Sequence, residues 1–140
     1  MRSVIAFAVL ALAGAASAGA SAALAPPVIH EPFTPLPCPM HPVSTLDIEG
    51  CQERALLRSD RTVDASARAV FYLLRSRSAR TDFVRGERSW LAYRRSSCAA
   101  EASKYAGGTA EPVEFAACEL TRNHVHLGEL SALLRTLRTH

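Results

Sequence analysis

The sequence predicts an all-α fold, a three-helix antiparallel domain with a disulfide across the hairpin of its second and third helices. Apolar residues recur at steps of three and four over most of residues 44–140, which is the period of an amphipathic helix. Gly107-Gly108 lies about midway between Cys98 and Cys118. A turn at these glycines would bring the two cysteines opposite each other on antiparallel helices.

The first predicted helix follows Ser44. Asp47 stands three residues later, so the pair resembles a capping box in which Asp replaces the usual Glu. The polar interval 58–62 could hold a kink or a shift of register. The predicted inner face comprises Leu46, Cys51, Ala55, Val63, Ala67, Val70, Phe71 and Leu74.

The second and third helices flank the glycine pair. The second is predicted over about residues 81–105 and ends where Gly107-Gly108 stops it. Thr109 is the predicted N-cap of the third helix, and Pro112 is tolerated in its first turn. The second helix has Phe83, Val84, Trp90, Leu91, Arg94, Cys98 and Ala102 on its predicted inner side. The third has Val113, Ala117, Leu120, His124, Leu127, Leu130, Leu134 and Leu137.

The N-terminus predicts export. Arg2 is the only charge before the apolar run 4–16, and two small-x-small sites place signal-peptide cleavage after Ala18 or Ala22, so residues 1–22 are the predicted signal peptide. A membrane anchor is the alternative, but the apolar core is short for a span and no basic stop-transfer cluster follows. We expect a bacterial periplasmic or secreted protein with no stable membrane insertion after cleavage.

Composition divides the remaining chain in two. Seven of the eight prolines lie between Pro26 and Pro42, which predicts an extended arm over residues 23–43, ordered only where Cys38 anchors it. The helical domain then occupies residues 44–140. The formal net charge is +3, and loss of Arg2 with the signal peptide leaves +2. That charge is too small to predict binding to nucleic acid or to a membrane.

All four cysteines lie after the signal peptide, where disulfides persist. Four cysteines allow three connectivities, and sequence alone does not choose among them. The hairpin geometry favours Cys98–Cys118, which leaves Cys38–Cys51 to tie the arm to the first helix. By chain entropy each bridge contributes about 3 kcal/mol.

A zinc site is the rival interpretation of the cysteines and histidines. It would use Cys38 with His41, or His124 with His126. These spacings match no structural zinc pattern. We therefore expect no metal and no cofactor.

Arg94 and His124 are charged or polar residues on predicted inner faces. An unpaired guanidinium there would cost several kcal/mol, so we expect Arg94 to pair with Glu87 or Asp64 in an ion pair stacked against a core Trp90. An anion-binding arginine is the alternative. His124 is predicted to be partly buried and satisfied, rather than a ligand or a catalytic base.

Catalytic motifs are missing from the sequence. It contains no Gly-x-Ser-x-Gly, no glycine-rich phosphate loop, no His-Glu-x-x-His and no Cys-x-x-Cys. We expect that the protein is not an enzyme.

Together these residues resemble the lysozyme inhibitor LprI-like N-terminal domain family of small exported bacterial helical domains. The family pattern joins an early cysteine pair, Gln-x-x-Trp-Leu-x-[Tyr/Phe]-Arg-Asp-x-x-Cys, a Gly-Gly-[Ser/Thr]-x-x-Pro turn and a later cysteine. The matching segments span about residues 38–130 and are Cys38, Cys51, Asp60 to Asp64, Glu87 to Cys98, Gly107 to Pro112, Cys118, and Thr121 to Leu127. Glu87 replaces the family glutamine, Arg95 replaces the aspartate and His124 replaces a late arginine, and a Glu87–Arg94 pair could replace the glutamine contact.

The resemblance implies protein–protein binding, because some members are associated with inhibition of lysozyme. We expect the domain to block a cell-wall hydrolase by occupying its cleft, and a structural or stress-related envelope module is the alternative. Many lysozymes are strongly basic, and acidic complementarity speeds association. The predicted binding residues are therefore Glu111, Glu114 and Glu119 of the third helix, although acids near a helix start also favour the helix dipole.

Overall fold

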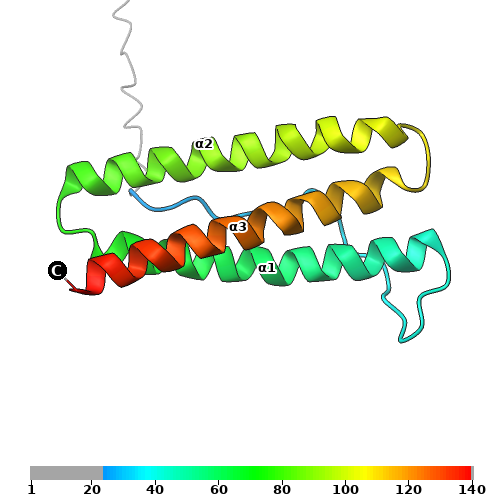
Figure 1. The fold of residues 1–140 in the computed structure, drawn as a ribbon, viewed down its shortest axis with the longest axis horizontal. Helices are drawn as coiled ribbons and strands as arrows, with labels where there is room; N and C mark the ends of the chain where they lie inside the picture. Colours follow the sequence, from blue (N-terminus) through cyan, green and yellow to red (C-terminus); the bar gives the residue numbers. More distant parts are fainter. Residues whose placement is uncertain (1–23, 140) are drawn as a thin grey trace, which may run out of the picture.

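A computed structural model describes residues 24–139 and consists of three long helices joined by two short connections (Figure 1). Helix α1 spans Thr45–Leu73, α2 spans Arg77–Ala102 and α3 spans Glu111–Thr139, with a short 3-10 helix η1 at Ser103–Tyr105. Successive helices run antiparallel (Figure 1). The described residues contain no strand, so the predicted all-α class is confirmed.

The predicted signal peptide, residues 1–22, lies outside the described residues. Within residues 24–139, none of the helices combines the length and the apolar character that crossing a bilayer requires.

The predicted capping box starts α1. The Ser44 hydroxyl accepts a hydrogen bond from the Asp47 backbone N–H at 3.1 Å, and Asp47 accepts one from the Ser44 N–H at 3.0 Å. The helix runs continuously through the polar interval 58–62, where Asp60 is buried. The interval therefore contains no kink, and its polar residue Asp60 faces the interior of the bundle. Leu46, predicted to face inward, is exposed because the buried face begins only at Gly50.

Helix α2 begins four residues earlier than predicted, because the Ser76 hydroxyl caps it by accepting from the Ala79 N–H at 3.0 Å. At the other end Gly107 adopts a left-handed φ of 76°, as expected for a glycine stop. The prediction that Thr109 caps α3 is wrong. The Thr109 hydroxyl instead bonds to the Thr45 hydroxyl at 3.4 Å, which joins this turn to the start of α1.

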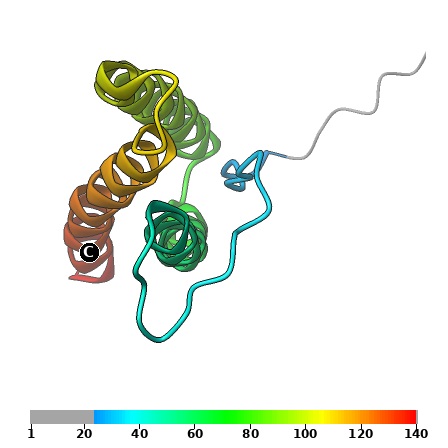
Figure 2. The same cartoon turned by 90° about the vertical axis from the view of Figure 1, so that its right-hand side faces the viewer.

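The interior has an apolar half and a polar half. Helix α3 packs against both α1 and α2 (Figure 2). Val63, Ala67 and Val70 of α1 form the apolar core with Leu130 of α3. Partly buried side chains extend it: Ile29, Leu74, Phe83, Trp90, Leu127, Leu134 and Leu137.

The proline-rich arm is extended as predicted, but Cys38 is not its only anchor. The Ile29 N–H donates to Asp64 at 3.1 Å, and the Leu36 N–H donates to Glu53 at 2.8 Å. The arm runs beside α1 and α2 on the side away from α3 (Figure 2). The prediction that Cys38 alone orders the arm is therefore wrong. Backbone N–H groups of the arm, which have no partner in a helix or strand, donate to carboxylates of α1.

Both predicted disulfides are present. Cys38–Cys51 has a Cα–Cα distance of 4.6 Å, and Cys98–Cys118 has one of 5.5 Å. The first bridge ties the arm to α1, and the second joins α2 to α3. Because the prolines and Cys38 place the arm against α1, the helix must leave room for its backbone.

Gly50 provides that room. A Cβ atom at this buried position would lie 2.2 Å from the Pro37 carbonyl oxygen and 2.8 Å from the Leu36 carbonyl oxygen. Both neighbours are backbone atoms, and the adjacent disulfide restrains them. Only glycine fits here.

We expect Gly50→Ala to lower the free energy of unfolding by about 2 kcal/mol, because overpacking against backbone outweighs the helix propensity that alanine adds. The matched control is Gly86→Ala in α2, where a Cβ would meet nothing within 4 Å. The control should raise stability by about 0.5–1 kcal/mol. Urea unfolding measures both, and a stabilising Gly50→Ala would contradict the close approach.

Candidate protein-binding site

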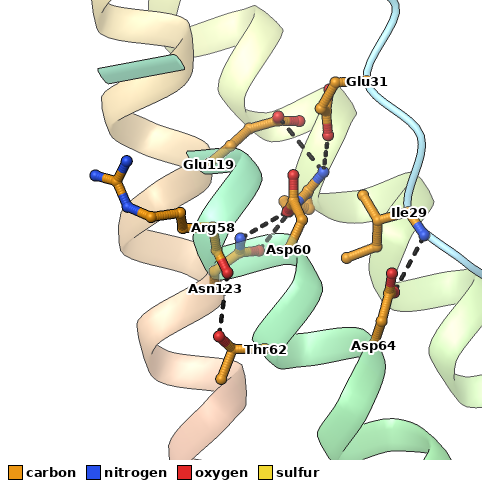
Figure 3. Close-up of polar contacts among 9 residues, drawn as sticks. Ile29, Glu31, Arg58, Asp60, Thr62, Asp64, Glu119 and Asn123 are labelled. Carbon is orange, nitrogen blue, oxygen red and sulfur yellow. Dashed lines mark hydrogen bonds and ion pairs between the residues drawn. The ribbon is translucent and has the colours of Figure 1, made fainter. Parts of the chain in front are cut away.

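Arg94 of α2 lies at the centre of a buried ionic cluster and is 3% exposed. Its Nη1 donates to Asp60 and to Asn123, each at 2.7 Å, while Nη2 pairs with Glu31 and lies 3.5 Å from a Glu119 oxygen. Figure 3 shows these four partners converging from the arm, α1 and α3. One guanidinium therefore connects the arm and all three helices.

The prediction that Arg94 is held in a structural ion pair is confirmed, but both predicted partners are wrong. Glu87 points to α3 instead, where its Oε2 lies 3.1 Å from His126 Nε2. Asp64 accepts from the backbone of Ile29. A Glu87–Arg94 pair does not form because the two residues lie two helical turns apart and face different neighbours.

Sequence reasoning missed the acceptors that Arg94 does use. Asp60 continues a buried face that also includes Leu56 and Val63, at helical spacing. Asn123 lies on the buried face of α3 in the same way. The sequence does contain a signal for these acceptors, because each is a polar residue at helical spacing from buried apolar residues. A search for apolar residues alone passes over such positions.

The cluster holds more negative charge than positive charge. Asp60, Glu31 and Glu119 face a single guanidinium. Burial raises the pKa of Glu119 to about 7 and also raises the pKa of Glu31, although Arg94 pulls both pKa values down. Neither Glu119 carboxylate oxygen has a hydrogen-bond partner among the described residues. The Glu119 carboxyl group of this cluster therefore gains or loses its proton near neutral pH.

Glu119 is 1% exposed, so it does not belong to an exposed acidic surface as predicted. The physical reason is its attraction to Arg94, which turns it inward. Of the other two predicted binding residues, Glu114 is exposed and Glu111 is half-buried. Glu111 also accepts a hydrogen bond from the Gly107 N–H at 2.9 Å, which fixes the turn.

Trp90 packs against the apolar core and stacks on His126, with ring centroids 3.9 Å apart and planes inclined by 17°. The Arg94 guanidinium lies 5.6 Å from the centre of the tryptophan ring, as the predicted stacking requires. Burial alone would lower the pKa of His126, but hydrogen bonds to Glu87 and Glu129 outweigh it and raise the pKa. The raised pKa extends the pH range over which His126 is protonated.

The predicted burial of His124 is wrong, because His124 is exposed and His126 is the buried histidine. The buried face of α3 follows Ala116, Glu119, Asn123, His126 and Leu130. This buried face lies to one side of the predicted apolar stripe on α3, because the polar residues Glu119, Asn123 and His126 face Arg94 and Glu87.

A loop closed by the Cys38–Cys51 disulfide projects at the end of the bundle where α1 begins (Figures 1 and 2). Met40 is 91% exposed and Val43 is 90% exposed. The backbone N–H groups of Val43 and Ser44 both donate to the Asp47 carboxylate, at 3.1 and 3.0 Å. The loop is therefore held from both ends while its apolar side chains face solvent.

A cavity of about 380 Å³ opens at the same end, between the arm and the three helices. Its lining is largely apolar and includes Phe33 and Phe115, and it also contains three carboxylates, those of Glu49, Glu53 and Glu111. None of the ion pairs in the described part of the chain involves these three residues. Burial, with the nearby charge of Glu53, raises the pKa of Glu49.

Charge along the chain is unevenly distributed. No lysine or arginine occurs from residue 24 to residue 53, whereas this stretch contains four carboxylates, Glu31, Asp47, Glu49 and Glu53. Glu31 and Glu53 are buried, so Asp47 and Glu49 are the two that give the projecting loop and the first turns of α1 their acidic surface, in a protein whose net charge is +3. A basic partner would find local complementarity here that the total charge conceals.

The structure gives no support to the zinc interpretation. Cys38 is in a disulfide, which removes it as a thiolate ligand. Within residues 24–139, no group of three or more histidine, cysteine or carboxylate side chains is placed to hold a metal ion.

Comparison with known proteins gives one match. The family model described as Lysozyme inhibitor LprI matches residues 38–130. The matched segment includes both disulfides, Arg94, the loop and all of the cavity lining except Phe33. No curated protein and no solved structure matches.

We expect the stability of the protein to fall as pH rises from 4.5 to about 7. Over this window Glu119 is more protonated in the folded state than in the unfolded state, because its folded-state pKa is raised. Stability therefore falls as pH rises, whereas a carboxylate with a lowered folded-state pKa would make it rise. Glu119→Gln should remove up to about 3 kcal/mol of this decline. Unfolding free energies measured by urea at pH 4, 6 and 8 check the slope, and parallel curves for the two proteins would contradict it.

We expect Glu87→Gln to lower the pKa of His126, because it replaces the carboxylate with a neutral amide. The unmodified protein should lose stability as pH rises from 6.5 through the raised folded-state pKa, and this loss should be smaller in the variant. NMR titration of the His126 ring protons measures the pKa directly. A ring titration unchanged by the substitution would show that Glu87 is not the partner.

Proposed function

Because this chain belongs to the lysozyme inhibitor LprI family, we propose that it is an exported binding protein that blocks a cell-wall hydrolase by protein–protein contact. The observation that carries the proposal is the family match over residues 38–130, which takes in nearly all of the helical domain. The family is one of inhibitors, in keeping with the expectation of a binding protein rather than an enzyme. Export follows from the predicted signal peptide at residues 1–22.

The described structure suits inhibition by binding. Two disulfides and the Arg94 cluster hold the arm, the loop and the helices in one arrangement. A rigid surface loses little conformational entropy when it binds, so more of the contact free energy appears as affinity. This is the property that an inhibitor needs.

The acidic end of the bundle supports a basic hydrolase as the partner. Glu111 and Glu114 remain proposed binding residues on α3, and both lie in its first turn. With the carboxylates of the loop and the cavity, they give the domain a local negative potential. Such a potential steers a basic partner and speeds its association.

We expect the refolded, oxidised mature protein to inhibit members of a panel of animal and bacterial lysozymes in a dose-dependent way. Clearing of a cell-wall suspension measures the inhibition. Inhibition should weaken as salt rises, because rim charges are screened within about 8 Å at physiological ionic strength.

A reduced and alkylated sample is the control, since loss of the disulfides should abolish inhibition. Failure of the folded, helical, oxidised protein to inhibit any hydrolase in the panel would overturn the proposal. That result would favour a structural or stress-related envelope module.

A further inference from the structure

We propose that the disulfide-closed loop of residues 38–51 is the segment that enters the cleft of the hydrolase, with Met40 and Val43 as its contact side chains. The inference rests on the proposed function and specifies the surface that performs it. The occupant of this surface is a basic hydrolase with a concave glycan-binding cleft.

Exposure is the first observation. Met40 and Val43 are the most exposed large hydrophobic residues in the described part of the chain, at 91% and 90%. They lie three residues apart in the projecting loop, and Leu46 adds a third exposed apolar side chain three residues further along the chain. An exposed apolar loop costs solubility and stabilises nothing in the domain, so a binding role explains it.

The second observation is that the loop is pre-organised. The Cys38–Cys51 bridge closes its base, and the Asp47 carboxylate accepts hydrogen bonds from the backbone N–H groups of Val43 and Ser44. Pro39 and Pro42 restrict the backbone on either side of Met40. The loop therefore presents Met40 and Val43 with little conformational entropy left to lose on binding.

Charge selects the partner. Residues 38–53 contain no lysine or arginine, and two of their carboxylates, Asp47 and Glu49, are partly exposed. The third, Glu53, is buried, and the nearest basic side chain in the sequence is Arg54, which donates to the Leu36 carbonyl oxygen. Asp47 and Glu49 follow the exposed apolar residues directly, so a basic rim around a partner's cleft would meet negative charge as the loop enters. The shape is complementary as well, because a projecting loop fits a concave site.

A second copy of this chain is a poorer occupant. The cavity near the loop is itself lined by Glu49, Glu53 and Glu111. Seating the acidic loop of another copy there would bring like charges together in a partly desolvated place, which is unfavourable.

The test is the double variant Met40→Ser/Val43→Ser, compared with the unmodified mature protein in the lysozyme panel. We expect at least a 20-fold loss of inhibition with an unchanged melting temperature, since both side chains contact solvent rather than the core. The matched control is Tyr72→Ser/Val125→Ser, which removes exposed apolar side chains from α1 and α3 away from the loop. The control should change inhibition by less than twofold.

Competition locates the contact on the hydrolase. A soluble cell-wall oligosaccharide that fills the cleft should displace the unmodified protein from an immobilised lysozyme in biolayer interferometry. Simultaneous binding of the oligosaccharide and the protein would overturn cleft entry.

The outcomes separate the two proposals. If the unmodified protein inhibits and the loop variant inhibits equally well, the loop proposal is wrong and the inhibitor function stands. If the unmodified protein binds no hydrolase in the panel, both proposals fail. Sedimentation velocity adds one further outcome, because dimers that the loop variant abolishes would identify a second copy as the occupant and overturn the assignment to a hydrolase.

Discussion

The rest of the structure depends on the charge of one buried guanidinium. Arg94 gathers carboxylates from the arm, α1 and α3, and none of these carboxylates would be tolerated in the interior without it. An ion cluster of this kind costs desolvation free energy and adds little net stability. The cluster instead specifies how the elements are arranged. Its acceptors reach Arg94 together only when the arm, α1 and α3 are placed as they are here.

That arrangement explains how the binding end is built. The apolar core around Val63 and Val70 secures one part of the bundle, and the disulfides and the ionic cluster secure the rest. The arm crosses between α1 and α2 because Glu31 and Ile29 are each fixed to a different helix. Gly50 then lets the arm backbone approach α1, so the loop closed by Cys38–Cys51 emerges from a rigid base.

Local charge matters more than total charge for the proposed function. A net charge of +3 argues against a basic partner, yet every Lys and Arg of the described chain lies after residue 53. The acidic stretch coincides with the loop, the first turns of α1 and part of the cavity wall. Electrostatic steering responds to this local potential within a Debye length, so association with a basic hydrolase is compatible with the composition.

The sequence by itself determined the all-α class, the capping box at Ser44 and the turn at Gly107, and it favoured the two disulfide pairings that the structure then established. These features depend on local chemistry or on short-range spacing, which a sequence displays directly. Only the tertiary structure decided the partners of Arg94, the inward position of Glu119 and the exchange of His124 for His126 as the buried histidine. The burial of Glu119 and of His126 depends on which face of α3 turns inward. The partners of Arg94 also come from the arm and α1, and the bonded groups lie up to 63 residues apart in the sequence. The period of a helix fixes which residues share a face, but the groups across the interface decide which face turns inward.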